Sequence, residues 1–278
     1  MSALARGSAS APAPAPAPAP ARRAEGVTFP RVLRSEWIKL RSLRSTTLTL
    51  AAGLAAMVGM AVLVALVRNG QWDRMTVAQR QSVSVSYDVH VGGRFLGQLL
   101  IGVVGVLVVT GEYATGMIRA TLAAVPRRLP VLAAKLTLLC ALLLSTTLVA
   151  SFAAWFAGSG IMSAHWSASL SDAGVLRAVI GQAVVLTATA LLGASLGFLL
   201  RNTAAAIATL FGIVLVLPVV GQLWSAVAPY LPPNALESFA LASVDAPALS
   251  PWAGLALFAG FTAVVLAGGI WTLLRKDA

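Results

Sequence analysis

The chain has 278 residues, of which 58% are apolar and only 10% charged, and its mean hydropathy is +0.86. So little charge could not cover the surface of a soluble protein, which favours a polytopic membrane protein. Lysine and arginine total 20 against 9 acidic residues, an excess that in a soluble protein would suggest nucleic-acid binding. Here the basic residues lie at the ends of apolar runs, where they set membrane orientation, so we expect no nucleic-acid partner.

The first 28 residues differ in composition from the rest, because positions 11–20 alternate alanine and proline. Such a run lacks amide donors, favours extended polyproline II and has no apolar surface to bury. We therefore expect a disordered tail over residues 1–28 and one membrane domain over residues 29–278. The first apolar run starts only near Thr46, which argues against a cleaved signal peptide.

Residues 30–46, PRVLRSEWIKLRSLRST, predict an amphipathic helix that lies in the membrane interface. Its apolar residues fall on one arc of a helical wheel: Val32, Leu33, Trp37, Leu40 and Leu43. Its basic residues point elsewhere, toward anionic headgroups: Arg31, Arg34, Lys39 and Arg41. Glu36 and Arg44 interrupt the apolar arc, and Glu36 could be turned toward a protein neighbour.

Six apolar segments follow and predict an all-α fold with six transmembrane helices: residues 46–67, 95–109, 131–157, 175–200, 203–224 and 253–274. A span needs about 20 apolar residues, so the second, which is the shortest, should recruit flanking residues. Only Arg201 and Asn202 separate the fourth segment from the fifth, which predicts a tight antiparallel hairpin. Pro218 can kink the fifth without breaking it.

Residues 225–251 contain five prolines around a short apolar piece at residues 235–242. Eight residues cannot cross a bilayer as a helix. This stretch therefore predicts a short re-entrant or interfacial segment on the external side. Small residues at helix-packing spacing, Gly93 with Gly97 and Gly193 with Gly197, predict close contacts inside the bundle.

The basic residues are divided unevenly between the two sides of the predicted membrane domain. With the N-terminus in the cytoplasm, fifteen lie inside: Arg6, Arg22, Arg23, Arg31, Arg34, Lys39, Arg41, Arg44, Arg119, Arg127, Arg128, Lys135, Arg201, Arg275 and Lys276. Five lie outside: Arg68, Arg74, Arg80, Arg94 and Arg177. This asymmetry predicts that both termini are cytoplasmic.

The sequence contains no motif typical of catalysis, metal binding or ion coupling. No carboxylate lies within an apolar core, where ion-coupled transporters usually keep one. HExxH, GxSxG and GxxxxGK[ST] are absent, and the single Cys140 allows no disulfide framework. We therefore expect no catalytic residues, no metal and no cofactor in this chain.

The stretch 111–128, GEYATGMIRATLAAVPRR, is a polar interruption between two apolar runs. Glu112 falls near a helix start, where it can act against the amide dipole, and Gly116 permits a sharp change of direction. An apolar stripe follows: Met117, Ile118, Leu122 and Val125. Arginines that could pair with a partner's carboxylates accompany it: Arg119, Arg127 and Arg128. An ordinary positive-inside loop would explain the arginines alone, so the stripe favours a docking element.

Three pieces of the chain together resemble the type-2 ATP-binding cassette (ABC) exporter permease family, in an actinobacterial-like form. RSEWIKLRSLRST resembles the family's elbow before the first span, residues 112–128 resemble its cytosolic coupling segment, and residues 249–278 resemble its closing span and basic tail. The resemblance covers about residue 29 to the C-terminus. The family's common threonine after the coupling glycine is Met117 here.

The resemblance assigns roles to two sets of residues. Those of the ATPase-coupling segment, a cytosolic coupling helix, are Glu112, Tyr113, Thr115, Gly116, Arg119, Pro126, Arg127 and Arg128. Those of the membrane-interface elbow are Arg34, Trp37, Lys39 and Arg41. Substrate-binding residues are not assigned.

The resemblance also implies an assembly. The chain would pair with a second permease subunit, the same or different, and with cytosolic ABC ATPase subunits that bind the ATP, in the bacterial cytoplasmic membrane. Family members export drugs, lipids, polysaccharide precursors or peptides, and the carboxylate-free interior suits an amphipathic or lipid-like cargo. The alternative is a non-transporting membrane anchor or regulatory subunit for an ATPase. An intramembrane enzyme ranks third.

Overall fold

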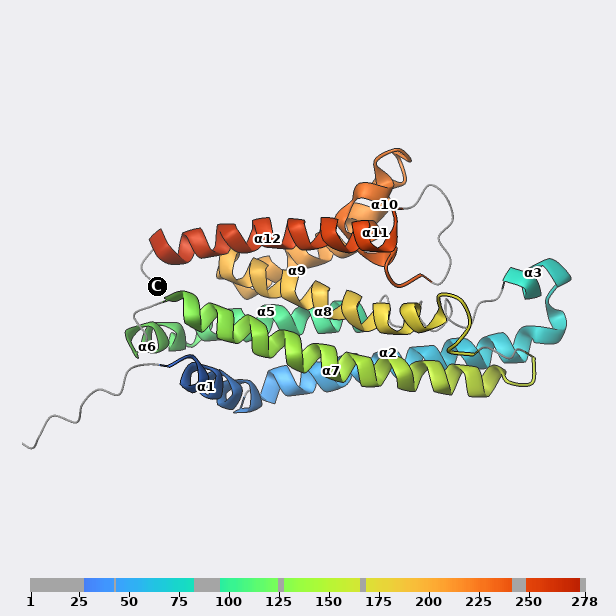
Figure 1. The fold of residues 1–278 in the computed structure, drawn as a ribbon, viewed down its shortest axis with the longest axis horizontal. Coiled ribbons are helices and arrows are strands. Elements are labelled where there is room, and N and C mark those ends of the chain that lie inside the picture. Colours follow the sequence, from blue (N-terminus) through green and yellow to red (C-terminus); the bar gives the residue numbers. More distant parts are fainter. Residues whose placement is uncertain are drawn as a thin grey trace, which may run out of the picture.

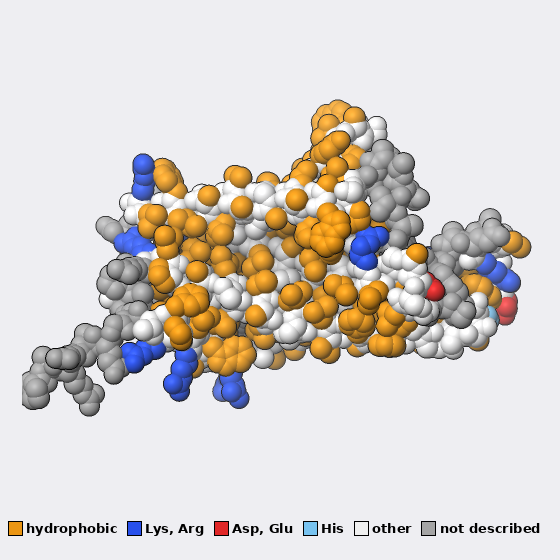
Figure 2. Space-filling model, viewed as in Figure 1, with side chains coloured by type: hydrophobic (Ala, Val, Ile, Leu, Met, Phe, Trp, Pro, Cys, Tyr) orange, Lys and Arg blue, Asp and Glu red, His pale blue; other side chains and the backbone are white. Residues whose placement is uncertain are grey.

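The computed structural model describes residues 28–42, 44–82, 96–124, 128–165, 169–241 and 249–275. Within these ranges the protein is all-helical, without a strand, as the apolar segments predicted. The long helices lie side by side along one axis (Figure 1). Apolar side chains cover the middle of the visible flank, and the blue basic side chains lie toward its two ends (Figure 2).

Five helical stretches are long and apolar enough to cross a membrane. They are α2 with its 3-10 extension (Arg44–Arg74), α7 (Arg128–Met162), α8 (Val175–Leu200), α9 to α10 (Thr203–Gly221) and α12 (Pro251–Arg275). These stretches indicate a multi-pass membrane protein. Six spans were expected, and among the described residues these five stretches have the length and composition of a span.

The remaining predicted span, residues 95–109, is a shorter helix. It forms α5 (Gln98–Ala114), which has 17 residues. Its predicted extension at residues 91–93 lies outside the described residues. Although α5 is short, ten of its residues are buried, which indicates that it lies at the centre of the bundle.

Small residues let α5 and α8 meet with their backbones in contact. A Cβ atom added at Gly105 of α5 would lie 1.9 Å from the carbonyl oxygen of Ala190. One added at Gly193 of α8 would lie 2.4 Å from the carbonyl oxygen of Gly102. Gly197 lies against a side chain instead, since an added Cβ there would be 3.0 Å from Cβ of Val109. The packing role predicted for Gly193 and Gly197 is confirmed. Gly93 lies outside the described residues.

The predicted tight hairpin joins α8 to α9 (Thr203–Phe211). Arg201 adopts a left-handed conformation, with φ of 54°, and its amide donates to the Gly197 carbonyl at 3.0 Å. That geometry closes α8. Asn202 then caps α9, since its side-chain oxygen accepts from the Ala205 amide at 2.9 Å.

A π-helical turn, Gly212–Val216, separates α9 from α10 (Leu217–Gly221). It ends two residues before Pro218, which lacks an amide hydrogen and whose ring crowds the preceding turn of a regular α-helix. The wider turn therefore accommodates the proline that was expected to disturb this span.

The proline-rich stretch contains two short helices, a 3-10 turn (Ala228–Tyr230) and α11 (Pro232–Glu237). Ala235 and Leu236 are fully buried. Gly254 of α12 allows this contact, because an added Cβ there would lie 2.0 Å from the Ala235 carbonyl oxygen. The apolar piece thus packs onto α12 at the end of the bundle opposite α6 (Figure 1).

Candidate functional site

Four chain segments meet at the end of the bundle that carries α6 (Met117–Ala124), which we call the α6 end. They are α1 (Phe29–Ser42), the last turn of α5, α6 itself and the first turns of α7 (Figure 1). The carboxyl end of α12 lies at the same end, because Arg128 of α7 donates to the Leu273 carbonyl. Helix α1 covers most of the helix predicted over residues 30–46, but residues 44–46 belong to α2 instead.

Gly116 makes the turn between α5 and α6. Its φ is 70°, in the left-handed region that favours glycine, and an added Cβ would meet nothing within 4 Å. The backbone conformation, and not lack of space, therefore requires glycine here. The sharp change of direction expected at Gly116 is confirmed.

Glu112 does not stand near a helix start, as the sequence suggested. It lies in the last turn of α5, where the partial negative charge of the helix end disfavours a carboxylate. It is also 3% exposed, so water does not solvate it. Other groups must therefore compensate its charge.

Two lysines compensate the charge of Glu112. With a second glutamate they form a closed arrangement of alternating charges, which we call the charge ring: Glu36, Lys39, Glu112 and Lys135. Lys39 Nζ lies 2.6 Å from Glu36 Oε1 and 3.1 Å from Glu112 Oε1. Lys135 Nζ lies 2.5 Å from Glu36 Oε2 and 2.9 Å from Glu112 Oε1. Each lysine thus bridges both glutamates, and the ring joins α1, α5 and α7.

The charge ring also reaches α6. Lys39 Nζ donates to Thr121 Oγ1 at 2.9 Å, and the same hydroxyl donates to the Met117 carbonyl at 3.0 Å. Lys39 therefore contacts its own helix, the end of α5 and α6 at once. The expectation that Lys39 points toward lipid headgroups is wrong, because two buried carboxylates draw it inward.

Burial makes the ring's neutrality important. Three of its side chains are at most 4% exposed and Lys39 is 18% exposed. Burial alone would lower the pKa of Lys39, but its hydrogen bond to Glu36 and the charge of Glu112 outweigh this and raise the pKa above its ordinary value. Glu112 Oε2 is buried without a hydrogen-bond partner among the described residues. Loss of one ring member would leave an uncompensated charge, at a cost of about 3–5 kcal/mol.

The other residues predicted for the elbow lie on the outer surface of α1. Val32, Glu36 and Leu40 form its buried face, at a spacing of four residues. Arg34 and Arg41 are exposed, and Trp37 is 45% exposed. Of the four residues predicted for the elbow, Lys39 therefore points into the protein, whereas Arg34, Trp37 and Arg41 lie on the surface.

The residues predicted for coupling are only partly assembled. Thr115 donates its hydroxyl to the Gly111 carbonyl, and Tyr113 lies under the Arg201 guanidinium, 5.5 Å from ring centroid to Cζ. Arg128 is engaged by α12. Pro126, Arg127 and Val125, with the side chains of Arg119 and Leu122, lie outside the described residues.

Sequence reasoning missed the ring as a unit, although two signals for it exist. Glu36 interrupts an apolar arc, and Lys135 lies inside an apolar run. Two opposite charges in apolar surroundings satisfy each other most simply by pairing. Glu36 does face a protein neighbour, as considered above.

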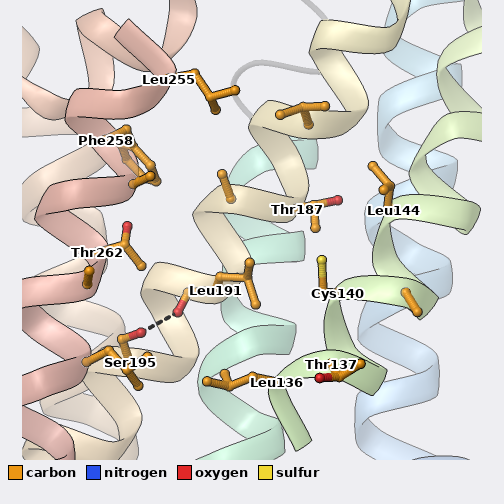
Figure 3. Close-up of a pocket in the computed structure, with 16 residues that line it drawn as sticks. Leu136, Thr137, Cys140, Leu144, Thr187, Leu191, Ser195, Leu255, Phe258 and Thr262 are labelled. Carbon is orange, nitrogen blue, oxygen red and sulfur yellow. Dashed lines mark hydrogen bonds between the residues drawn. The ribbon is translucent and has the colours of Figure 1, made fainter. Parts of the chain in front are cut away.

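A second feature is an apolar groove between α7, α8 and α12, with a volume of about 760 Å³. Leu191 of α8 and Phe258 of α12 line it, and Cys140 of α7 points into it (Figure 3). Ser195 donates to its own helix, at 2.7 Å to the Leu191 carbonyl, whereas Thr262 Oγ1 is buried without a partner among the described residues. The groove could hold an alkyl chain.

Comparisons of the chain with protein-family models, with curated proteins and with solved structures find no match. Among the described residues, no group of three or more His, Cys, Asp or Glu side chains is arranged to hold a metal ion.

Proposed function

We propose that the chain is the membrane permease subunit of an ABC-type exporter, with ATP hydrolysed by separate cytosolic subunits. The observation that carries the proposal is α6: a short helix outside the five long apolar stretches, turned away from α5 at Gly116 and held at its base by the charge ring. A helix in this position is suited to receive force from a partner and pass it to α5 and α7.

The distribution of charge supports a cytoplasmic location for the α6 end. Ten described basic residues belong to it: Arg31, Arg34, Lys39, Arg41, Arg44, Arg119, Arg128, Lys135, Arg201 and Arg275. Four belong to the opposite end: Arg68, Arg74, Arg80 and Arg177. By the positive-inside rule both α1 and the end of α12 then face the cytoplasm.

The surface of α6 offers a contact for an ATPase subunit. Ile118 is 5% exposed and holds α6 to the bundle, whereas the neighbouring Met117 is 40% exposed. An exposed apolar side chain on a short helix outside the long apolar stretches suits a docking contact with a partner protein. The exposure of Met117 supports the proposal that residues 112–128 have the coupling role that the resemblance implies.

The groove between α7, α8 and α12 supports an amphipathic or lipid-like cargo. It is lined almost wholly by apolar side chains, and a small ion would find no charged ligand among its lining residues. A second permease subunit completes the transporter in this proposal.

The test is copurification with an ABC ATPase whose gene lies beside that of this chain. Met117→Asp on α6 should reduce ATPase binding strongly, because it places a charge in the proposed contact. Val77→Asp is the matched control, since Val77 is an exposed apolar residue on α3 (Val77–Ser82) at the opposite end. Equal ATPase binding by Met117→Asp and wild type would overturn the docking role of α6.

Transport itself needs a separate measurement. The complex in lipid vesicles should show ATP turnover that an alkyl-bearing cargo stimulates, together with ATP-dependent movement of that cargo. ATPase binding without stimulated turnover or movement would instead favour a non-transporting anchor.

A further inference from the structure

The charge ring holds three helices and α6 in one arrangement through very few atoms. Glu36 and Lys39 come from α1, one turn apart, and their partners Glu112 and Lys135 are 73 to 99 residues away in the chain. Among the hydrogen bonds of the described residues, the one from Lys39 to Thr121 joins α6 to another helix. Helix α1 is therefore attached directly to α6.

We propose that the charge ring makes α1 and α6 one mechanical body, in which Lys39 is the positioning residue that sets the orientation of α6. The inference rests on the proposed function only where it concerns the ATPase; the link between α1 and α6 is a property of this chain alone. It assigns α1 a role beyond the membrane interface, since displacement of α6 would carry α1 with it.

Charged contacts suit such a link better than apolar ones. The hydrophobic effect is non-directional, so an apolar surface that shifts along its neighbour stays stabilised as long as it remains out of water. The Lys135 ammonium is 3% exposed, so a shift of an ångström or two would take it away from its carboxylate partners without bringing it to water. The ring therefore has one favoured register. The surroundings of the ring are apolar and buried, with Val131 and Ala134 of α7 packed on Val32 of α1.

Two double variants separate this link from the general cost of disturbing a buried charge. Glu36→Gln with Lys39→Met leaves the Lys135–Glu112 pair neutral, but it removes both charges by which α1 holds the ring. Glu36→Gln with Lys135→Met also leaves a neutral pair, Lys39–Glu112, and retains the hydrogen bond from Lys39 to Thr121. Each variant removes one glutamate and one lysine, so they match in net charge and in the kind of change.

The measurement is the distance distribution between spin labels on α1 and α6. Arg41 and Ala123 are exposed, and replacing each with cysteine in a Cys140→Ser background gives two labelling sites. We expect a narrow distribution in the parent and in the Glu36→Gln/Lys135→Met variant, and a broadened one in the Glu36→Gln/Lys39→Met variant. Similar distributions in the two double variants, whether narrow or broad, would overturn the proposal.

A second readout uses the ATPase and keeps the two proposals distinguishable. If α6 is the docking helix, the variant that detaches α1 should bind the ATPase about tenfold more weakly than its matched double, which corresponds to about 1.4 kcal/mol. If the spin labels separate the two variants while their ATPase affinities are equal, the link stands and the docking role of α6 fails.

Discussion

The charge ring and the α5–α8 crossing are both buried, yet opposite means hold them together. At the crossing, Gly105 and Gly193 let two backbones touch, and close contact supplies the energy. In the ring, four long side chains span the gaps between helices, and each buried charge is compensated by opposite charges. The crossing therefore requires residues without a side chain, whereas the ring requires that every charge keep its opposite partner. Different substitutions should disrupt the two regions.

The largest effect is expected from breaking the neutrality of the ring. Lys135→Met leaves a net negative charge in a buried site, which should destabilise the protein by about 3–5 kcal/mol. The second change Glu36→Gln should recover much of that loss, because it restores neutrality. Thermal unfolding of the detergent-solubilised protein measures both. If the double variant is no more stable than Lys135→Met, the loss of stability does not come from an uncompensated charge.

At the crossing, adding one methyl group should be nearly as harmful. Gly105→Ala would place Cβ 1.9 Å from the Ala190 carbonyl oxygen. Helices α5 and α8 must then separate, at about 2–3 kcal/mol. Gly59→Ala is the control, because an added Cβ there meets nothing within 4 Å. Equal melting temperatures for the two variants would contradict the described contact.

A smaller effect should follow from detaching α6 while the ring stays neutral. Thr121→Val keeps the shape of the side chain and removes the acceptor of Lys39, at about 1 kcal/mol. Unfolding should change little, but hydrogen exchange of the α6 amides should accelerate. Thr115→Val makes a matched control, since the Thr115 hydroxyl donates to the Gly111 carbonyl of the adjoining helix α5 and not across to α1. Unchanged exchange in α6 would count against the bond's importance.

The smallest effect is expected from pH. The folded pKa of Lys39 is raised, so its contribution to stability is complete below the unfolded pKa, which is about 10.4, and is lost as pH rises through the higher folded value. The α1–α6 distance distribution should therefore be constant between about pH 6 and 9. Broadening within that range would show that Lys39 loses its proton more easily than its contacts indicate.

How far the sequence predicted each region follows from the range of the interactions. Apolar runs, the Arg201–Asn202 hairpin and the small-residue spacing at Gly193 are local patterns, and the structure confirms all three. The ring brings together residues up to 99 positions apart, so no local pattern specifies it. The prediction for Lys39 was wrong because it considered only the lipid headgroups around α1. It did not include the carboxylates of Glu36 and Glu112, which Lys39 contacts. Glu112 was misplaced because it comes before the turn at Gly116, and that turn ends α5 before α6 begins.

The groove contains one more useful group. Cys140, the only thiol of the chain, is partly buried and points into the space between α7, α8 and α12 (Figure 3). An oil-soluble alkylating reagent would therefore report from inside the groove of the natural protein, without any engineered label. The rate of Cys140 alkylation would then measure whether the groove is occupied. A compound that binds in the groove would slow the reaction.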